Sequence, residues 1–250
     1  MKVPSKMKIS VVIPVLNERA SLPATIAALR ACRGVAEIIV SDGGSTDGTV
    51  AWLQSQPDIV LVRSIRGKGP QINVGAAAAF DVPDAADISD IALLFLHADS
   101  LISQPAIDAL HAALADPQLA GGAFYIRFAE SRPQSLRLVA WGINVRARFR
   151  NSATGDQGIF VRKSVFDSIG GAPEWPLFED VELVRRIKRA GKFTVLRTPL
   201  TISGRRYIEH GVLRTALLIY ALRLAYWLGV PPQRLKNWFR DARWKQKELR

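Results

Sequence analysis

Residues 93–100 read Leu93-Leu94-Phe95-Leu96-His97-Ala98-Asp99-Ser100, an apolar run that stops abruptly at a histidine and an aspartate. A short continuous apolar run is typical of a strand buried in a parallel sheet. In open α/β sheets, ligands bind at the carboxyl ends of the strands. A carboxylate placed there can hold a divalent cation against a phosphate, because hard cations prefer oxygen ligands. The stretch therefore predicts a buried strand that ends at a ligand site.

Strand and helix patterns alternate on both sides of this run. Before it, we expect strands at 9–15, 37–40 and 59–63 and helices at 18–31, 49–54 and 70–80. After it, we expect helices at 104–115, 136–150 and 180–191 and strands at 121–128, 157–162 and 193–196. This order predicts an α/β fold with a parallel sheet and helices on both of its faces. The pattern ends near Gly204, which divides the chain into an expected domain 1–204 and a helical tail 205–250.

The composition excludes several classes of protein. With 250 residues, 48% of them hydrophobic, the chain can bury a substantial core, so disorder is not expected. The single cysteine, Cys32, excludes an internal disulfide and a cysteine-rich zinc site. Residues 1–8 are basic and lead at once into a strand pattern, unlike a signal peptide. We therefore expect a cytoplasmic protein, either free or peripheral on the inner face of the cell membrane.

The net charge of +12 is concentrated near the end of the chain, where residues 201–250 hold 11 Lys/Arg and 3 Asp/Glu. Residues 212–230 are apolar apart from Arg214 and Arg223, and an arginine near the middle makes a membrane span costly. One interpretation is a helix on an anionic membrane surface, in contact through 212–245, with Tyr226 and Trp227 at the interface. The residues that would then face the headgroups are Arg234, Lys236, Arg240 and Arg243. The other interpretation is a helix packed on the domain or on a second subunit of a homodimer. No nucleic-acid recognition motif accompanies the charge, so nucleic acid is not expected as a partner.

The segment 41–48, which follows the second expected strand, is rich in glycine. Its backbone N–H groups could hold an anion or nucleotide, and Asp42 could accept hydrogen bonds from a base or ribose. The glycines do not form G-x-G-x-x-G, so the segment is not a dinucleotide fingerprint. A turn followed by a helix cap explains this segment equally well.

Two further segments carry charges that suit phosphate chemistry. Arg66 and Lys68 flank a glycine before a helix and could clamp a diphosphate, although an ordinary surface loop would look the same. Glu179 and Asp180 begin a helix, where they could act as caps or, alternatively, as a general base at the mouth of a cleft.

Taken together, four segments resemble family 2 glycosyltransferases of the GT-A fold, a Rossmann-like α/β fold with a mostly parallel mixed sheet. The similarity spans residues 8 to about 200, with the motifs in the order of the family. The segments are Val11-Val12-Ile13-Pro14-Val15-Leu16-Asn17-Glu18, Ser41-Asp42-Gly43-Gly44-Ser45-Thr46-Asp47-Gly48-Thr49, His97-Ala98-Asp99 and Phe178-Glu179-Asp180. Four motifs in register are far more specific than any one of them.

The resemblance implies an inverting, single-displacement transfer from a nucleotide-diphosphate sugar, UDP being the expected nucleotide, assisted by Mn²⁺ or Mg²⁺. Asp99 matches the last residue of the D-x-D metal motif of the family. Asp180 matches the residue usually assigned as base, with Glu179 beside it. The resemblance implies nucleotide binding by residues of these segments, namely Pro14, Asn17, Glu18, Asp42, His97, Ala98 and Asp99.

The chain departs from the family pattern at two places. His97 stands where D-x-D has its first aspartate, and imidazole is a poorer ligand for Mg²⁺ than for Mn²⁺, so His97 could instead hydrogen-bond the donor. Gln71 is expected among the nucleotide-binding residues. It lies in a Gln-Ile-Asn segment where many relatives have Ala-Arg-Asn, so contact with the diphosphate could fall to Arg66 or Lys68.

Further similarity is to a bacterial subgroup of transferases associated with radical-SAM or selenium-related genes. In this comparison, Asp156 and Gln157 lie where relatives shape the acceptor side. The Q-x-x-R-W signature of processive synthases is degenerate at 203–207, which implies transfer of a single sugar. Two other hypotheses are a non-catalytic nucleotide-sugar-binding or membrane-associated protein, and a nucleotidyltransferase. The second would need a Gly-rich, basic loop after the first strand, where Pro14 to Glu18 stands instead.

Overall fold

The computed structural model describes residues 7–79, 91–130 and 133–244, with residues 240–244 described by their backbone alone. The strands are β1 (Lys8–Val15), β2 (Val35–Asp42), β3 (Ile59–Arg63), β4 (Ile91–Phe95), β5 (Ser100–Leu101), β6 (Leu119–Phe128), β7 (Ile159–Arg162) and β8 (Lys192–Ile202). The helices are α1 (Leu22–Arg30), α2 (Thr49–Gln54), α3 (Lys68–Ala77), α4 (Gln104–Leu114), α5 (Ser135–Arg150), α6 (Lys163–Ser168), α7 (Glu179–Ala190), α8 (Arg205–His210), α9 (Val212–Trp227) and α10 (Pro232–Trp244). A 3-10 turn, η2 (Gly155–Gln157), precedes β7.

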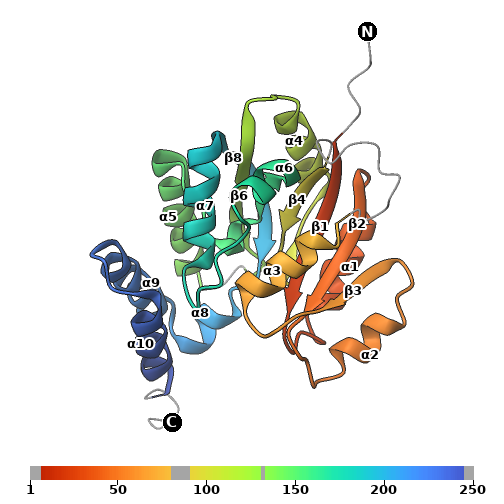
Figure 1. Cartoon of the computed structure of the whole chain (residues 1–250). Coiled ribbons are helices and arrows are strands. Elements are labelled where there is room, and N and C mark those ends of the chain that lie inside the picture. Colours follow the sequence, from red (N-terminus) through yellow and green to blue (C-terminus); the bar gives the residue numbers. More distant parts are fainter. Residues whose placement is uncertain (1–6, 80–90, 131–132, 245–250) are drawn as a thin grey trace.

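The strands form one eight-stranded sheet in the order β3-β2-β1-β4-β7-β6-β8-β5 (Figure 1). The first four are parallel, as expected, but β7 is antiparallel to both β4 and β6. β6 and β8 are parallel, and β5 is antiparallel to β8. The sheet is therefore mixed, because an apolar run shows that a strand is buried but does not show its direction.

Helices cover both faces of the sheet, which explains why β4 is apolar at every position. Val11 and Leu94 point into the core beneath α1 and α4, whereas Val12, Leu93 and Phe95 point into a second core beneath α3, α6 and α7. Successive side chains of a strand alternate between faces, so a strand covered on both sides must be apolar throughout. Most expected elements lie within a few residues of the observed ones, but β8 extends six residues beyond the expected strand 193–196. The short β5 and α6, which were not expected, are too brief to show a periodicity.

Parallel pairing brings the carboxyl ends of β1, β2 and β4 to one edge of the sheet. Val15 pairs with Asp42, and the N–H of Leu96 donates to the carbonyl of Val12 at 3.1 Å. Three of the predicted site segments therefore meet at this edge, because each directly follows one of these strands.

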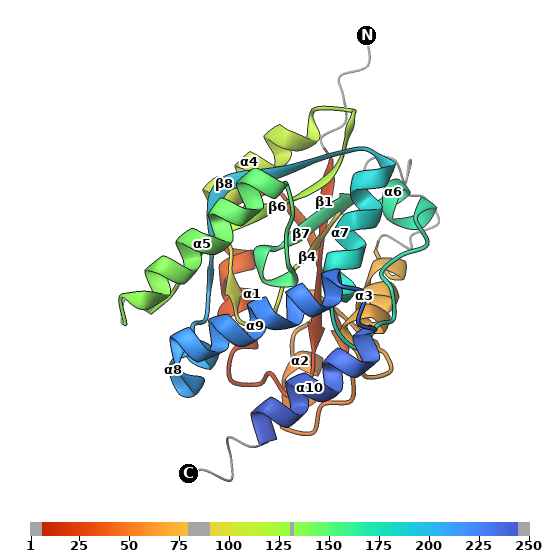
Figure 2. The same cartoon turned by 90° about the vertical axis from the view of Figure 1, so that its left-hand side faces the viewer.

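The tail folds back on the rest of the protein. Figure 2 shows α9 running across the molecule from α8 towards α3, with α10 below it. The ring of Tyr226 on α9 lies 5.1 Å from that of Phe178 and 6.5 Å from that of Trp175. In the described part of the chain, no helix combines the length and the apolar character that crossing a membrane requires.

Candidate active site

The loops after β1 and β2 are joined to each other by hydrogen bonds. Asn17 has a positive φ of 58°, which asparagine tolerates better than most residues. Its Oδ1 accepts the N–H of Thr46 at 2.8 Å, and its own N–H donates to the Oγ of Ser45 at 2.8 Å. The N–H of Glu18 donates to the hydroxyl of Thr49 at 3.1 Å. Asn17 and Glu18 therefore shape this edge through the loop that follows β2.

Asp42 is buried and organises its own loop. Its carboxylate accepts the N–H groups of Gly44 at 2.9 Å and Ser45 at 3.1 Å, the pattern of an Asx turn. Pro14, next to Val15, is half-buried. It lines a small cavity together with Lys68 and His97. Contact of Asp42 with a base or ribose stays a prediction.

Gln71 is buried at the first turn of α3 and ties two strands together. Its Nε2 donates to the carbonyls of Val15 at 2.7 Å and Ser41 at 2.8 Å. These bonds use both amide protons, so we expect Gln71 to hold the strand ends in place rather than to contact a donor. No arginine stands at the neighbouring position, Ile72, and two exposed cations remain for a diphosphate, Arg66 on the preceding loop and Lys68 at the first position of α3.

His97 and Lys68 face each other across the site, with Lys68 Nζ 3.1 Å from His97 Nε2. Burial of the imidazole, followed by the charges of Lys68 and Arg206, holds the pKa of His97 well below its usual range. A neutral imidazole accepts a hydrogen bond from the Lys68 ammonium through Nε2. His97 therefore orients a cation at the position where the resemblance predicts the diphosphate.

Asp99 lies at the end of the loop after β4 and is accessible to solvent, whereas Ala98 behind it is buried. Desolvation by the surrounding walls raises the pKa of Asp99, and the cations Arg206 and Lys68 oppose this rise. Within the ranges that the structure describes, no group of three or more His, Cys, Asp or Glu side chains is arranged to hold a metal ion. A cation would thus be held by Asp99 together with oxygens of a phosphate ligand and water, which suits Mg²⁺ or Mn²⁺.

Glu179 and Asp180 begin α7 after Phe178, which has a positive φ of 63°. The left-handed conformation is unfavourable for a bulky residue, and such strain gathers at functional sites. Asp180 Oδ2 accepts the N–H of Gly155 at 2.6 Å, and Oδ1 accepts the N–H of Val181 at 2.7 Å. The carboxylate is therefore held in one orientation by two backbone donors.

Glu179 is buried beside Asp180, and burial, reinforced by the Asp180 charge, raises its pKa to about 7. The ammonium of Lys68 opposes this shift. Glu179 and Asp180 line one small cavity together with Pro14, Lys68 and His97. Three of the residues predicted for the nucleotide thus line the same cavity as the predicted base, although they are up to 166 positions apart from it in the chain, whereas Asn17, Asp42 and Asp99 are not among the lining residues.

The turn η2 joins the base to the histidine. An added Cβ at Gly155 would lie 3.0 Å from His97 Nε2 and 3.4 Å from Asp180 Oδ2, so a larger residue here would require the His97 ring to shift. Asp156 next to it is half-buried and accepts a hydrogen bond from Thr154. Contact of Asp156 with an acceptor stays a prediction.

Gln157 differs from the expectation. It is fully buried, its Nε2 donates to the carbonyl of Phe124 at 3.0 Å, and its Oε1 accepts the N–H of Thr154 at 3.2 Å. A residue without exposed surface cannot touch an acceptor in this conformation, so Gln157 anchors η2 instead. A loop glutamine beside an aspartate looks exposed in the sequence, and only the packing beneath β6 shows otherwise.

Two site residues of the tail were missed. Arg206 on α8 lies close enough to His97 and Asp99 for its charge to lower the pKa of both. Tyr207 packs edge-on against Phe128 with ring centres 5.3 Å apart, and burial, then Asp156, raises its pKa to about 12. Arg206 and Tyr207 are the last two residues of the degenerate Q-x-x-R-W segment at 203–207. The position of this segment is the signal in the sequence that could have identified them.

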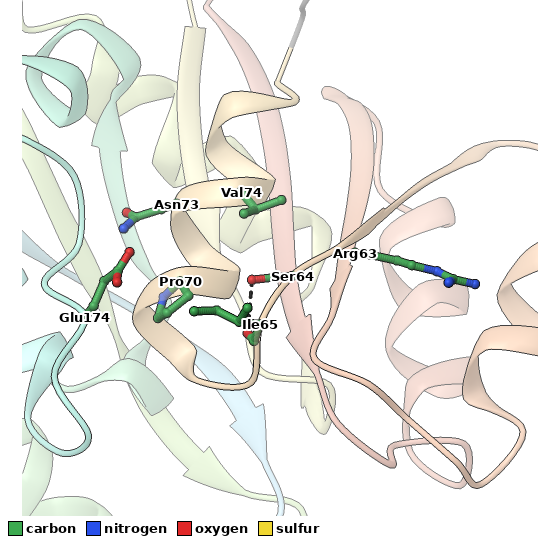
Figure 3. Close-up of a pocket in the computed structure, with 7 residues that line it drawn as sticks. All are labelled: Arg63, Ser64, Ile65, Pro70, Asn73, Val74 and Glu174. Atoms are coloured by element: carbon green, nitrogen blue, oxygen red, sulfur yellow. Dashed lines mark hydrogen bonds between the residues drawn. The ribbon is translucent and has the colours of Figure 1, made fainter.

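A wider pocket lies away from this chemistry. It has a volume of ≈ 470 Å³ and lies between the loop after β3, the outer side of α3 and Glu174. Figure 3 shows that its side chains do not converge: Arg63 points away from the others, while Asn73 and Glu174 lie on the opposite side. Asn73 instead holds the loop before α7, donating to the carbonyl of Ala172 at 3.0 Å and accepting its N–H at 2.8 Å.

The sequence pattern described as Glycosyl transferase family 2 matches residues 10–170, more than half of the chain. The chain belongs to glycosyl transferase family 2. The match includes the segments around Asn17, Asp42 and Asp99 and ends before Glu179 and Asp180. The comparison with curated protein sequences finds no match.

Solved structures show that this family 2 chain has a GT-A-like fold. Residues 1–349 of S. aureus TarS are similar with a TM-score of 0.59 and 16% identity, over 79% of this chain and 60% of that one. The same TarS fragment in complex with UDP-GlcNAc gives a TM-score of 0.58 at 17% identity, over 79% and 58%. The mannosyltransferase PcManGT from Pyrobaculum calidifontis, in complex with GDP-Man and Mn²⁺, gives 0.56 at 22% identity, over 78% and 56%. The present chain thus spans about 60% of the length of the TarS fragment.

Proposed function

We propose that this family 2 glycosyltransferase moves one sugar from a nucleotide-diphosphate sugar to a hydroxyl or phosphate acceptor. The observation that carries the proposal is the position of Gly155. Its N–H binds Asp180, and a Cβ added to it would lie 3.0 Å from Nε2 of the His97 ring that orients Lys68. One turn therefore joins a carboxylate suited to proton removal with a cation suited to a departing diphosphate. The solved relatives in complex with UDP, UDP-GlcNAc and GDP-Man support this class of donor.

In the proposed reaction, Asp180 accepts the proton of the acceptor oxygen as that oxygen attacks the anomeric carbon. General-base assistance of this kind contributes typically about 10²–10⁴-fold. Lys68, oriented by His97, offsets the negative charge that builds up on the diphosphate as its bond to the sugar breaks. Only one attack occurs, because Asp180 acts as a base and not as a nucleophile, so the sugar inverts its configuration.

A divalent cation fits this site in part. Asp99 offers one accessible carboxylate at the edge of the sheet, and Mg²⁺ sites that also use substrate phosphates often have only one or two. His97 Nε2 is engaged by Lys68, so the imidazole is not aimed at a cation through that nitrogen. The bound cation would neutralise charge on the leaving diphosphate, and PcManGT in complex with Mn²⁺ supports this assignment.

Several finer features belong to the same proposal. UDP as the nucleotide, transfer of a single sugar and the division into a domain 1–204 and a tail 205–250 remain predictions, as does the subgroup associated with radical-SAM or selenium-related genes. The alternatives are a non-catalytic binding protein and a nucleotidyltransferase. Release of a nucleoside diphosphate favours the transferase, whereas release of pyrophosphate would favour the nucleotidyltransferase.

The first test is calorimetric titration of the purified full chain with UDP, GDP, ADP and CDP, each with Mn²⁺ and again after chelation. We expect one nucleotide to bind, and its affinity to fall when the metal is removed. Absence of binding by folded protein, shown by a cooperative thermal transition, would contradict the transferase proposal. Thr198→Val, a change in β8 away from the cavity, serves as a control for handling of variant protein.

We also propose that the outer side of α5 and α9 rests on an anionic membrane surface. The large apolar side chains exposed there are Leu138, Trp141, Phe149, Leu213, Leu217, Leu224, Trp227 and Leu228. Exposed cations lie among them, namely Arg137, Arg148 and Arg214, with Arg234 and Lys236 on α10. Aromatic and aliphatic groups mixed with basic residues suit the interface of a bilayer with acidic headgroups.

Sedimentation with vesicles tests this surface. Binding to vesicles with 30% phosphatidylglycerol, weak binding to pure phosphatidylcholine and loss of binding in Leu224→Glu/Trp227→Glu would support it. Ile65→Glu is the matched control, because Ile65 is 71% exposed but lies on the loop after β3. A dimer in light scattering that the double variant converts to monomer, without vesicle binding by the unaltered chain, would assign this surface to a second subunit instead.

A further inference from the structure

Two arginines from distant helices are partly buried next to the candidate base. Arg146 lies on α5, where its Nη2 donates to Gln157 Oε1 at 3.2 Å. Its Nη1 is buried and has no hydrogen-bond partner among the described residues. A buried donor without an acceptor is uncommon and costs stability, so such a group is often completed by a ligand or water.

Arg223 lies on α9, which packs against α5. Burial, followed by the charge of Arg146, lowers the pKa of Arg223 to about 10, and burial also lowers the pKa of Arg146. Neither guanidinium forms an ion pair with a carboxylate in the described ranges. Two like charges withdrawn from water lack the partner that buried charges normally have.

The groups that face the two arginines are already engaged or uncharged. Asp180 accepts N–H groups of Gly155 and Val181, and Asp156 accepts the hydroxyl of Thr154. The charges of both carboxylates raise the pKa of the two arginines and so favour their protonated form. Neither carboxylate accepts a hydrogen bond from Arg146 Nη1. Tyr207 and Tyr220 complete the surroundings, and burial keeps Tyr207 protonated.

The connections of the two arginines place them on the acceptor side. Arg146 binds Gln157 at the end of η2, and Gly155 at the start of η2 binds Asp180. Tyr226, three residues after Arg223 on α9, packs its ring against Phe178, two residues before Asp180. An oxyanion held between the guanidinium groups would therefore lie close to the group that takes the proton.

We propose that Arg146 and Arg223 form a binding subsite for an anionic group, a phosphate or a carboxylate, carried by the acceptor. Arginine suits this role because its planar guanidinium binds such oxyanions through paired hydrogen bonds. Only the statement that the anion belongs to the acceptor rests on the proposed transferase function. The subsite as such rests on the two side chains and can be measured without catalysis.

Titration of the full chain with inorganic phosphate in the presence of chelator tests the subsite directly. We expect saturable binding that weakens at least tenfold in Arg223→Gln and in Arg146→Gln and is retained in part in Arg223→Lys. Arg214→Gln is the matched control, since Arg214 is an exposed arginine of the same helix. Loss of phosphate binding in Lys68→Gln together with full binding in Arg223→Gln would place the anion in the donor site and overturn the proposal. Acetate as a second probe separates a carboxylate site from a phosphate site.

Acceptor chemistry is tested with donor consumption as the readout. Glucose 6-phosphate and octyl phosphate, each compared with its unphosphorylated counterpart, represent a soluble and an apolar source of phosphate. We expect the phosphorylated member of one pair to accelerate release of nucleoside diphosphate, and Arg223→Gln to raise its KM at least tenfold without changing the KM for the donor. Nucleotide binding without any effect of Arg223→Gln on phosphate or acceptor would refute the subsite alone. Failure of nucleotide binding would refute the transferase function instead.

Discussion

The proposed donor side and the proposed acceptor side of the candidate site are built in different ways. The donor side uses loops that directly follow parallel strands β1, β2 and β4, and side chains of Asn17, Asp42 and Gln71 tie these loops together by hydrogen bonds to backbone groups. The acceptor side gathers η2, α5, α7 and α9 from the second half of the chain. Ring contacts and single hydrogen bonds, such as Phe178 with Tyr226 and Gly155 with Asp180, hold it together.

This difference suggests that the two sides differ in rigidity and in what they recognise. Strand ends in a covered parallel sheet have little freedom, so the donor side is ready for the part of the substrate that family members share. A wall of helices packed on one another can change with few consequences for the sheet, which suits an acceptor that differs among relatives. Changes on one side should therefore leave the binding function of the other largely intact.

The largest expected effect follows from Asp180→Asn. Asparagine can still accept one backbone N–H but cannot take a proton at neutral pH, so kcat should fall about 10²–10⁴-fold. Steady-state release of nucleoside diphosphate measures this loss, and calorimetry should show unchanged nucleotide affinity. Retention of full turnover would exclude Asp180 as the base and return the non-catalytic hypothesis to consideration.

Glu179→Gln should change the dependence of stability on pH. The folded protein keeps the Glu179 proton up to about pH 7, whereas the unfolded chain releases it near the ordinary value of 4.5, so stability falls as the pH rises between these values. At pH 8 the variant should therefore be more stable than the parent, by on the order of 3 kcal/mol, and at pH 4 the difference should vanish. Urea unfolding at both pH values measures the difference.

The same variant distinguishes the two acidic residues as bases. In the parent, the rate of transfer plotted against pH could rise with an apparent pKa near 7. If this rise is absent in Glu179→Gln and turnover is also lost, Glu179 rather than Asp180 removes the proton. Survival of turnover in this variant supports Asp180. Because the two carboxyls are neighbours, the apparent pKa values belong to the pair and are compared between variants rather than assigned singly.

On the donor side, Asp99→Asn should weaken nucleotide binding in Mn²⁺ about ten- to hundredfold, because an amide oxygen holds a hard cation less strongly than a carboxylate. Affinity after chelation should match that of the parent. Calorimetry under both conditions measures the change. Equal dependence on Mn²⁺ in parent and variant would mean that the cation is held without Asp99.

The smallest expected effect concerns the link between the two sides. Asn73 on α3 holds Ala172 in the loop before α7 by two hydrogen bonds. Asn73→Ala should lower the free energy of unfolding by about 1–2 kcal/mol and slow transfer while nucleotide affinity stays the same. Arg30→Ala, which breaks an exposed ion pair with Asp58, is the control and should cost less than about 1 kcal/mol. Equal costs for both variants would show that the loop is held by other contacts.

The same contrast explains what could be predicted from the sequence. The four parallel strands and the placement of Asp42 and Asp99 at their ends follow from apolar runs that stop at polar residues, because buried strands must be apolar on both faces. The direction of β7 and the two-residue β5 have no such signal. Asp180 was identified only through resemblance, since acidic residues at the start of a helix are equally expected as caps.

Other features depend on packing between distant segments. The burial of Gln157 beneath Phe124 and the pairing of Arg146 with Arg223 join positions that no local pattern connects. The tail illustrates the point: its apolar residues predicted either a membrane surface or a protein surface. In the structure one side of α9 packs on Phe178 while Leu224 and Trp227 stay exposed, so packing on the domain accounts for one side of the helix and contact with a membrane stays a prediction for the other.

The contact between Phe178 and Tyr226 also affects how the protein is made. A ribosome releases the strands and loops of the donor side first, and they can form their sheet edge once β4 and Asp99 have emerged. The Tyr226 ring, which packs on Phe178, is synthesised more than one hundred residues after Asp99. At ordinary rates of translation this delay is on the order of ten seconds. A nascent chain could therefore hold nucleotide before the wall beside the proposed base exists, and we expect competence for transfer only after Tyr226 has been synthesised.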